Sequence, residues 1–430
     1  MEIRVSLDSK MSDTQNIQAA IDICAQAGGG RVVIPGGKIY TIGTLFLRSH
    51  MELHLETGCV LKSSKNPNDF TLLTAQQGDA FILQTLPSYQ CSDYGGQPPT
   101  AMLYGKHLED IQLTGFGCID GNEEYYHAKE TPYHIEGKGY PRPPMILLED
   151  VHHLTIRQVT LQNNAFWTLH MVGCSDVEID GIRILNNLKM ANCDGIDPDH
   201  CQNVRISNCF IRGGDDAIVI KNTKAFAHYG NTSNILVHGC VLQSTSAALK
   251  IGTEGETDFE NILVSNCQIL SSNRGISIQI RDKGNVRHVR MQNIQMETRL
   301  FSHEWWGRAE PISISSINRN ENTLSGTIDD VTVQNIDAQS ENGILIYADK
   351  AGKINHIRLK DVRLRLQKTT KWPVVGYDYR PGLIQNKECS LVYGLHVYNA
   401  ELETDELHVE VDPTMQSSFA GEKNLGVCNP

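Results

Sequence analysis

A short phrase of alternating apolar and polar residues recurs through the middle of the chain. A polar residue of hydrogen-bond acceptor type is followed by apolar residues at every second position and then by a turn, as in Asn203–Cys209, Asn234–Cys240 and Asn261–Cys267. This alternation has the two-residue period of a strand rather than the 3.6-residue period of a helix. Successive copies mostly lie 23 to 31 residues apart. A spacing in this range predicts a repeat architecture.

The repeat predicts one architecture for most of the chain. Further copies occur at Leu154, Val177, Asp330 and His356 and near Asn285, after which one gap is longer. A coil of about 25 residues would hold two or three short strands, and successive coils would stack in parallel about 4.8 Å apart. We therefore predict an all-β fold, a right-handed parallel β-helix that forms a single domain over residues 1–430.

The N-terminal part predicts a cap of about residues 1–50 for the solenoid. Ser12 and Gln15 can form a capping box before the apolar-periodic segment 17–23. The predicted capping helix ends at the glycines 28–30 and leads into a strand. A helix in this place would cover the open end of the β-helix and block association between strand edges.

Several segments interrupt the repeat. Residues 87–101 and 120–144 are rich in Gly, Pro, Tyr and His and predict long loops, while 300–326 predicts an insertion. The coils between about 150 and 300 carry the candidate chemistry. From about residue 366 the period is lost.

Composition narrows the function classes. The formal net charge of −12 argues against a nucleic-acid partner, which would need clustered Lys and Arg. There is no run of about 18 apolar residues, so no membrane partner is expected. The chain starts without a signal-like apolar core, which predicts a cytoplasmic protein; a leader absent from this sequence would make it secreted or periplasmic.

Twelve cysteines are dispersed along the sequence, without a CxxC pair. This pattern favours buried reduced thiols over a disulfide framework or a zinc site. Cys209, Cys240 and Cys267 occupy the same place in three consecutive repeats. We expect them to form an internal ladder of small apolar groups, because stacking in line gives poor tetrahedral geometry for a metal.

Carboxylates gather beside glycines in two stretches, Asn192–Asp199 and Gly213–Ile218. Asp194 and Asp216 are 22 positions apart, which is about one coil, so stacking would bring them to neighbouring strands. Asp215 and Asp216 would reach one cleft only if the backbone bends at the glycines before them. Such crowding raises the pKa of at least one carboxyl and suits sites that need an acid and a base. We predict these three aspartates to be catalytic.

The two aspartate motifs also carry a family resemblance. Asn192-Cys193-Asp194 followed by Gly214-Asp215-Asp216 resembles the polygalacturonase family of glycoside hydrolases, family 28, as a divergent bacterial-type member. The resemblance runs from about residue 13 to about 300, and it includes Arg142-Pro143-Pro144, Trp167, His170 and Asp194–Asp199. It implies a pectin-lyase-like solenoid. It also implies that Asp215 protonates the leaving oxygen while Asp194 and Asp216 deprotonate the attacking water, with inversion of the anomeric centre.

Two departures from the family pattern concern substrate binding. Ala247 stands where the family has the histidine of Gly-His-Gly, and Ser277-Ile278-Gln279 replaces an Arg-Ile-Lys triplet that grips a uronate. Cations in successive coils then become candidates for a replacement anion pocket, since Arg and Lys hold carboxylates. The predicted substrate-binding residues are Asn192, Asp197, Lys221, Lys250, Arg281, Trp167, His170, Trp305 and Trp306.

These features together predict an inverting glycoside hydrolase, without cofactor or bound metal, that cleaves a pectin-type uronate-containing oligosaccharide. A long loop with His127, Tyr133 and His134 would roof the cleft and favour exo-action. The sequence does not decide the oligomeric state or the sugar. A β-helix polysaccharide lyase using calcium in the acidic cluster is the first alternative. A non-catalytic glycan-binding protein is the second, and it would hold its glycan unchanged.

Overall fold

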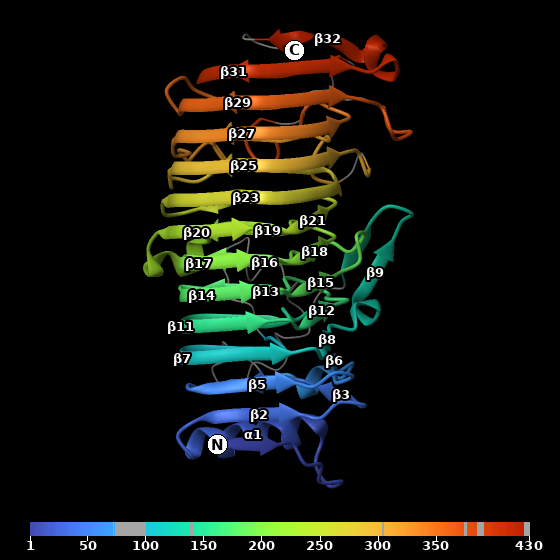
Figure 1. Ribbon diagram of the computed structural model, residues 1–430, viewed down its shortest axis with the longest axis vertical. Coiled ribbons are helices and arrows are strands. Elements are labelled where there is room, and N and C mark those ends of the chain that lie inside the picture. Colours follow the sequence, from blue (N-terminus) through green and yellow to red (C-terminus); the bar gives the residue numbers. More distant parts are fainter. Residues whose placement is uncertain are drawn as a thin grey trace. The chain divides into compact units, whose positions relative to one another are not determined.

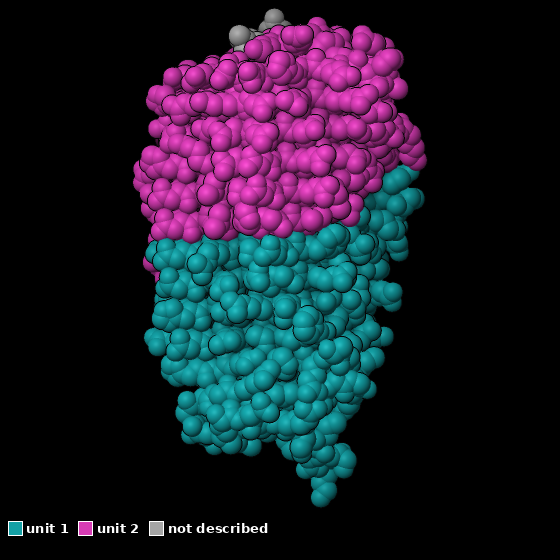
Figure 2. Space-filling model, in the orientation of Figure 1, with its two compact units in different colours: residues 1–214 teal, residues 215–430 magenta. Residues whose placement is uncertain are grey.

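The chain forms two compact units, residues 1–214 and residues 215–430 (Figure 2). The computed structural model describes residues 1–71, 73, 100–137, 142–302, 305–373, 376–384 and 391–424. The predicted loop 87–101 therefore lies outside the described residues except for its last two positions. That residues 1–430 act as a single domain stays a prediction.

The first unit consists mainly of short strands (Figure 1). Its elements are β1 (Glu2–Arg4), α1 (Asp13–Gln26), β2 (Gly30–Ile34), β3 (Ile39–Ile42), β4 (Leu45–Phe46), β5 (Met51–Leu55), β6 (Val60–Ser63), η1 (Pro67–Asp69), β7 (Leu103–Gly115), β8 (Cys118–Asp120), η4 (Glu123–Tyr126), β9 (His127–Glu130), β10 (Ile135–Gly137), β11 (Ile146–Arg157), β12 (Thr160–Gln162), β13 (Leu169–Val172), β14 (Ser175–Asp180), β15 (Arg183–Leu185), β16 (Ile196–Asp199), β17 (Gln202–Ser207) and β18 (Phe210–Gly213).

The second unit continues with longer strands. Its elements are β19 (Ile218–Asn222), η5 (Lys224–Tyr229), β20 (Thr232–His238), β21 (Val241–Ser244), β22 (Ala247–Gly255), β23 (Phe259–Ser272), β24 (Arg274–Ile280), β25 (Val286–Thr298), β26 (Ile312–Ser316), β27 (Ile328–Ser340), β28 (Ile344–Ala348), β29 (Ile354–Leu366), β30 (Val392–Tyr398), β31 (Ala400–Val411), η6 (Pro413–Ser418) and β32 (Phe419–Asn424).

Each unit is a stack of parallel coils in the register that the repeat predicts. In the first unit, Leu154 pairs with Val177 and Val177 with Val204. In the second, Ile235 pairs with Ile262 and Ile262 with Val289, and the series continues through β27 and β29 (Figure 1). These side chains point inward and fill the core. The prediction of a right-handed parallel β-helix is confirmed.

The turn residue that opens each copy of the repeat has a left-handed backbone conformation. Asn234, Asn261, His288, Asp330 and His356 have φ between 50° and 59°. Asn and Asp tolerate this conformation better than other non-glycine residues. The Asn261 side-chain amide also donates to the Asn234 amide oxygen at 3.2 Å, so neighbouring turns are joined. The bend between strands is thus encoded locally and repeated coil after coil.

The predicted helical cap is confirmed. Ser12 and Gln15 form both hydrogen bonds of a capping box, and α1 buries Ile17 and Ile21. The helix contacts β1 to β4, which belong to the first coils of its unit (Figure 1). Among the helices that the structure describes, none has the length and apolar character needed to cross a membrane.

The predicted internal ladder of thiols is present in the second unit. Cys240 and Cys267 are buried and free, and Cys267 interacts with the sulfur of Cys240. The hydrogen bond with Cys240 and burial both raise the pKa of Cys267. Within the described ranges, no group of three or more His, Cys, Asp or Glu side chains is arranged to hold a metal ion.

Two predicted loops contain strands. In 120–144, β9 and β10 form an antiparallel hairpin, which is seen in Figure 1 beside the shorter strands. In 300–326, β26 lies within the predicted insertion and pairs in parallel with β24, with Ile312 opposite Ile276. The insertion is therefore not all loop. The long gap in the repeat arises because the extra residues precede and follow a normal strand.

A segment between β29 and β30, residues 376–384, lies on the outer face of the sheet in the second unit. Tyr377 and Tyr379 pack with Leu345 and Ile317 in a buried cluster. Leu345 pairs with Ser313 of β26, which pairs with Ser277 of β24. We refer to residues 376–384 as the covering segment.

Candidate active site

Asp194 lies in the first unit, two residues before β16. The backbone amide of Thr168 donates to the Asp194 carbonyl oxygen at 3.0 Å, which ties this turn to the preceding coil. The Asp194 side chain is buried. The position before the strand, rather than within it, leaves Asp194 free of the strict alternation that governs β16.

A buried arginine braces the turn before Asp194. Arg142 donates to the Ala191 carbonyl oxygen and to the Asn192 side-chain oxygen, each at 3.0 Å. The guanidinium also lies over the Phe166 ring, 4.9 Å from its centroid. Asn192, predicted to bind substrate, has a left-handed φ of 57° and holds the turn through Arg142. The hairpin β9–β10 adds to this support because Ile135 packs on the same turn.

His170 and Asp197 lie opposite each other on β13 and β16. Both are fully buried, and the His170 Nε2 atom lies 3.1 Å from the Asp199 Oδ2 atom. Trp167 is also interior: its ring stacks on Phe166 with centroids 5.4 Å apart. Its burial and its neighbours make Trp167 part of the core. That Trp167 contacts a sugar stays a prediction.

Asp215 and Asp216 lie in a bend between β18 and β19, as the glycines before them predict. A side chain at Gly214 would place its Cβ atom 2.2 Å from the Met190 carbonyl oxygen and 2.5 Å from that of Asn187. Since no Cβ atom tolerates such contacts, this backbone path requires glycine. Because of the bend, Asp215 and Asp216 are not part of a regular strand, so their side chains need not point to opposite faces.

The carboxylate of Asp216 is enclosed by three donors. Its Oδ1 atom accepts from the Ser246 hydroxyl at 2.8 Å and from the Ala247 amide at 3.1 Å, while its Oδ2 atom accepts from the Lys250 ammonium at 2.6 Å. The side chain is 1% exposed. Burial, the largest single cause, raises the pKa of this carboxyl, but the charges of Lys250 and Lys221 together with the hydrogen bonds from Lys250 and Ser246 outweigh it, so the pKa of Asp216 is lowered. Asp216 is therefore ionised at neutral pH.

Asp215 has different surroundings. Its Oδ1 atom accepts from the Asp216 backbone amide at 3.1 Å, and its carbonyl oxygen accepts from the Ser244 hydroxyl at 2.6 Å. Its exposed fraction is 6%, against 1% for Asp216. Adjacent carboxylates in unlike environments are the arrangement in which one serves as acid and the other as base.

The three cations predicted to form an anion pocket are engaged within the protein. Lys250 is bonded to Asp216, and the Lys221 ammonium lies 3.8 Å from the Glu254 carboxylate. Arg281 is 0% exposed and donates to the carbonyl oxygens of four residues: Ile280, Ser315, Tyr379 and Pro381. Two of these acceptors, Tyr379 and Pro381, belong to the covering segment, so donors of Arg281 are engaged within the protein. That Arg281 grips a substrate carboxylate stays a prediction.

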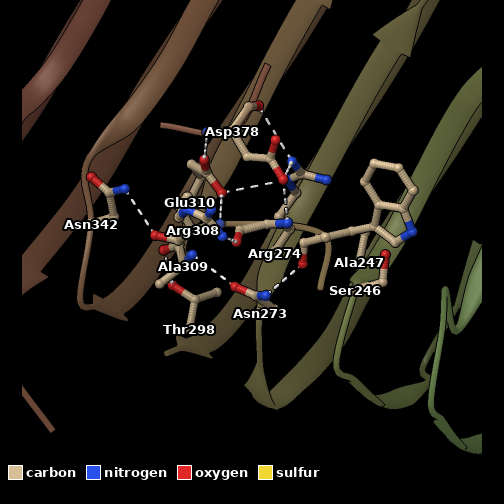
Figure 3. A network of polar contacts seen from close by, with 12 residues as sticks. Ser246, Ala247, Asn273, Arg274, Thr298, Arg308, Ala309, Glu310, Asn342 and Asp378 are labelled. Carbon is tan, nitrogen blue, oxygen red and sulfur yellow. Dashed lines mark hydrogen bonds and ion pairs between the residues drawn. The ribbon is translucent and has the colours of Figure 1, made fainter. Parts of the chain in front are cut away.

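The covering segment is held by a buried ionic network (Figure 3). The Asp378 carboxylate lies 3.1 Å from Arg274 and accepts from the Gly307 backbone amide at 2.6 Å. The Asp378 backbone amide donates to Glu310, which is itself 3.4 Å from Arg274. Burial raises the pKa of Asp378. The charges and hydrogen bonds of its partners, with Arg274 and Arg380 foremost, lower it by more, so the pKa lies below its ordinary value. The segment thus covers β24 at the coil that follows Lys250.

Trp305 and Trp306 belong to the same arrangement. Both are partly buried, with ring centroids 6.0 Å apart. Arg380 of the covering segment lies over the Trp306 ring at 5.1 Å and donates to the Trp305 carbonyl oxygen at 2.7 Å. These contacts place the two tryptophans beside the covering segment. Contact of either ring with substrate stays a prediction.

Known proteins share this organisation. The family model of glycosyl hydrolases family 28 matches residues 60–300, more than half of the chain. The chain belongs to this family. The matched region contains both aspartate motifs, so membership agrees with the resemblance that the motifs carry.

Individual relatives are distant. A probable polygalacturonase from Vitis vinifera is 28% identical over 304 residues, covering 68% of this chain and 59% of the relative. A probable exopolygalacturonase X from Aspergillus fumigatus is 27% identical over 281 residues, covering 62% and 57%. The chain thus spans less than two thirds of the length of these relatives. The exopolygalacturonase structure from Thermotoga maritima has a TM-score of 0.67 at 18% identity, covering 85% of this chain and 87% of that one, and supports the fold.

Several site residues were missed by sequence reasoning. Ser246 and the Ala247 amide bind Asp216, Glu254 faces Lys221, and Asp378 anchors the covering segment. Ser246 carried a signal, because it directly precedes Ala247, the position at which the family resemblance implies a histidine. Asp378 carried none, since it lies in the part of the sequence where the repeat is lost.

Proposed function

We propose that the protein hydrolyses glycosidic bonds of a pectin-type, uronate-containing oligosaccharide with inversion at the anomeric carbon. Asp215 is the general acid that protonates the leaving oxygen. Asp194 and Asp216 position and deprotonate the attacking water. Inverting glycosidases use a pair of carboxyl functions in which the base stays ionised while the acid carries a proton. Family membership supports the reaction class.

One observation carries the proposal. Asp216 directly follows Asp215 in a bend that requires glycine, and it is buried yet ionised by Lys250, Lys221 and two hydrogen-bond donors. Burying a charge is costly unless it is paired and hydrogen-bonded. An ionised carboxylate maintained next to a second carboxyl is what a base beside an acid requires.

Exo-action has two supports. Ser277 and Gln279 of β24 and Ser313 of β26 are buried. The covering segment packs on Leu345 and Ile317 and takes two hydrogen bonds from Arg281, directly after β24. A substrate chain lying along the outer face of the sheet would have to end before β24. The names of two relatives, exopolygalacturonase X and the Thermotoga maritima exopolygalacturonase, agree with this mode.

The test uses purified protein and a panel of pectic oligosaccharides, with products read by chromatography and mass detection. Asp215→Asn and Asp216→Asn are each expected to lower kcat/KM at least about 100-fold, because acid and base catalysis contribute that much. Asp405→Asn, at an exposed position on β31, is the matched control and should keep full activity. Saturated monosaccharide products of inverted anomeric configuration are expected. Full activity in Asp215→Asn would refute the assignment of the acid.

The lyase alternative makes a different prediction. A calcium-dependent lyase would lose activity with a chelator and give an unsaturated product that absorbs in the ultraviolet. Hydrolysis by the proposed aspartates would continue in chelator and give no such product. Either result is obtained from the same incubations.

A further inference from the structure

We propose that Lys250 is a positioning residue for Asp216, and that with the Ala247 amide it replaces the histidine that the family has at position 247. The inference rests on the proposed hydrolytic function, and it assigns Lys250 to the catalytic carboxylate rather than to the substrate. It therefore replaces the prediction that Lys250 binds an anionic group of the sugar.

The geometry determines which group Lys250 serves. Lys250 lies on β22 directly opposite Val219 of β19, the strand that follows the aspartate bend. From there its ammonium reaches one oxygen of Asp216 at 2.6 Å, while Ser246 and the Ala247 amide bind the other oxygen. The three donors, Ser246, the Ala247 amide and Lys250, lie within five consecutive residues. Since they bind both oxygens of Asp216, they fix the orientation of its carboxylate. Charge-assisted bonds of this length are among the stronger ones in proteins.

The charges around Asp216 come from two strands and from the bend itself. Lys250 of β22 and Lys221 of β19 favour its ionised form. Asp215 is the adjacent carboxyl, and Glu254 of β22 lies 3.8 Å from Lys221 and offsets part of that lysine's charge. Lys250 is therefore the main cation acting on Asp216. Without it, burial would be opposed mainly by Lys221 and Ser246, and the pKa of Asp216 would rise toward the protonated carboxyl, which cannot accept a proton from water.

The surroundings of Lys250 disfavour a substrate-gripping role. Its side chain is 13% exposed and its ammonium already has a carboxylate partner. A uronate binding there would compete with Asp216 for the same charge and would weaken the base during the reaction. On the next strand, β24, the residue paired with Lys250 is Ser277, which has no charge to help bind a uronate.

The main experiment compares Lys250→Met with Lys250→Arg by measuring kcat and kcat/KM against pH. In Lys250→Met the acid limb of both profiles should move to higher pH by about one to three units, as expected for loss of an opposite charge at this distance. Lys250→Arg keeps the charge and should return the limb toward that of the wild type. An unchanged acid limb with an increase in KM alone would overturn the proposal and make Lys250 a substrate-binding residue.

A second measurement does not depend on activity. In the wild type the lowered pKa of Asp216 contributes stability that is present above the pKa of the unfolded chain and is lost as the pH falls. In Lys250→Met the pKa would be raised, so its urea midpoint should fall further below that of the wild type as the pH rises from about 4 to about 7. Adding Asp216→Asn should remove this growing difference. If the difference in urea midpoint between wild type and Lys250→Met does not grow with pH, the proposed pairing of Lys250 with Asp216 is refuted, even if the protein is a hydrolase. If the difference grows but the protein hydrolyses no glycan, the pairing stands and only the proposed function is refuted.

Discussion

Removing the charge of Asp378 tests whether the covering segment is held by its buried network. In Asp378→Asn the side chain keeps its shape but loses the negative charge that faces Arg274 and Arg380. These partners lie 3.1 Å and 2.9 Å from its oxygens. The Gly307 amide would also lose a carboxylate acceptor.

The size of the effect follows from burial. Arg274 and Asp378 are 1% and 0% exposed, so solvent screens the pair little. Breaking a buried pair by removing one partner costs about 3–5 kcal/mol, because the remaining charge stays buried. Glu310 remains near Arg274 and favours the lower end of that range. About 3 kcal/mol would multiply the fraction of molecules with the segment detached by roughly 100.

Limited chymotrypsin digestion reports this opening, because Tyr377 and Tyr379 are cleavage sites that are buried in the closed segment. We expect cleavage after either tyrosine to become faster by up to roughly 100-fold in Asp378→Asn, with sites identified by mass spectrometry. Asp405→Asn is the control for a change of net charge. If the segment ends the cleft, the variant should also release internal fragments from long substrates.

Two outcomes would refute this reasoning. If Asp378→Asn and Asp378→Ala are both cleaved after Tyr377 and Tyr379 at the wild-type rate, with an unchanged urea midpoint, the network does not hold the segment. If cleavage accelerates but products stay monosaccharides, the segment is held as described but does not determine exo-action.

Three further predictions concern packing and pH. Trp167→Ala should lower the free energy of unfolding in urea by about 3–5 kcal/mol, and Trp306→Ala by less, because only Trp167 is fully buried in the core; equal losses would contradict the assignment. Burial lowers the pKa of His396 from 6.5 to about 4, so stability should fall by about 3 kcal/mol as pH decreases from 7 to 4, and His396→Asn should reduce that fall. Gly214→Ala should reduce both stability and kcat, since its Cβ would meet two carbonyl oxygens; wild-type values of both would show that the bend tolerates a side chain.

The coil repeat and the two aspartate motifs were readable from the sequence because their signals are local. Alternation of apolar residues, with Asn or Asp at the turn, determines each strand and each bend within a few residues, as Asn234 and Asn261 show. The capping box at Ser12 is equally local. The glycines before Asp215 indicated a bend, and the structure gives the bend its steric cause.

Only the tertiary structure decided what covers each face and which charges meet. Lys250 contacts Asp216 across 34 positions, and Arg274 contacts Asp378 across 104. Arg281 directly follows β24, and no local pattern reveals that it donates to Tyr379 and Pro381 of the covering segment. Because stacking brings together residues from different coils and from a segment without periodicity, the pairing of buried charges depends on the whole fold and not on any local pattern.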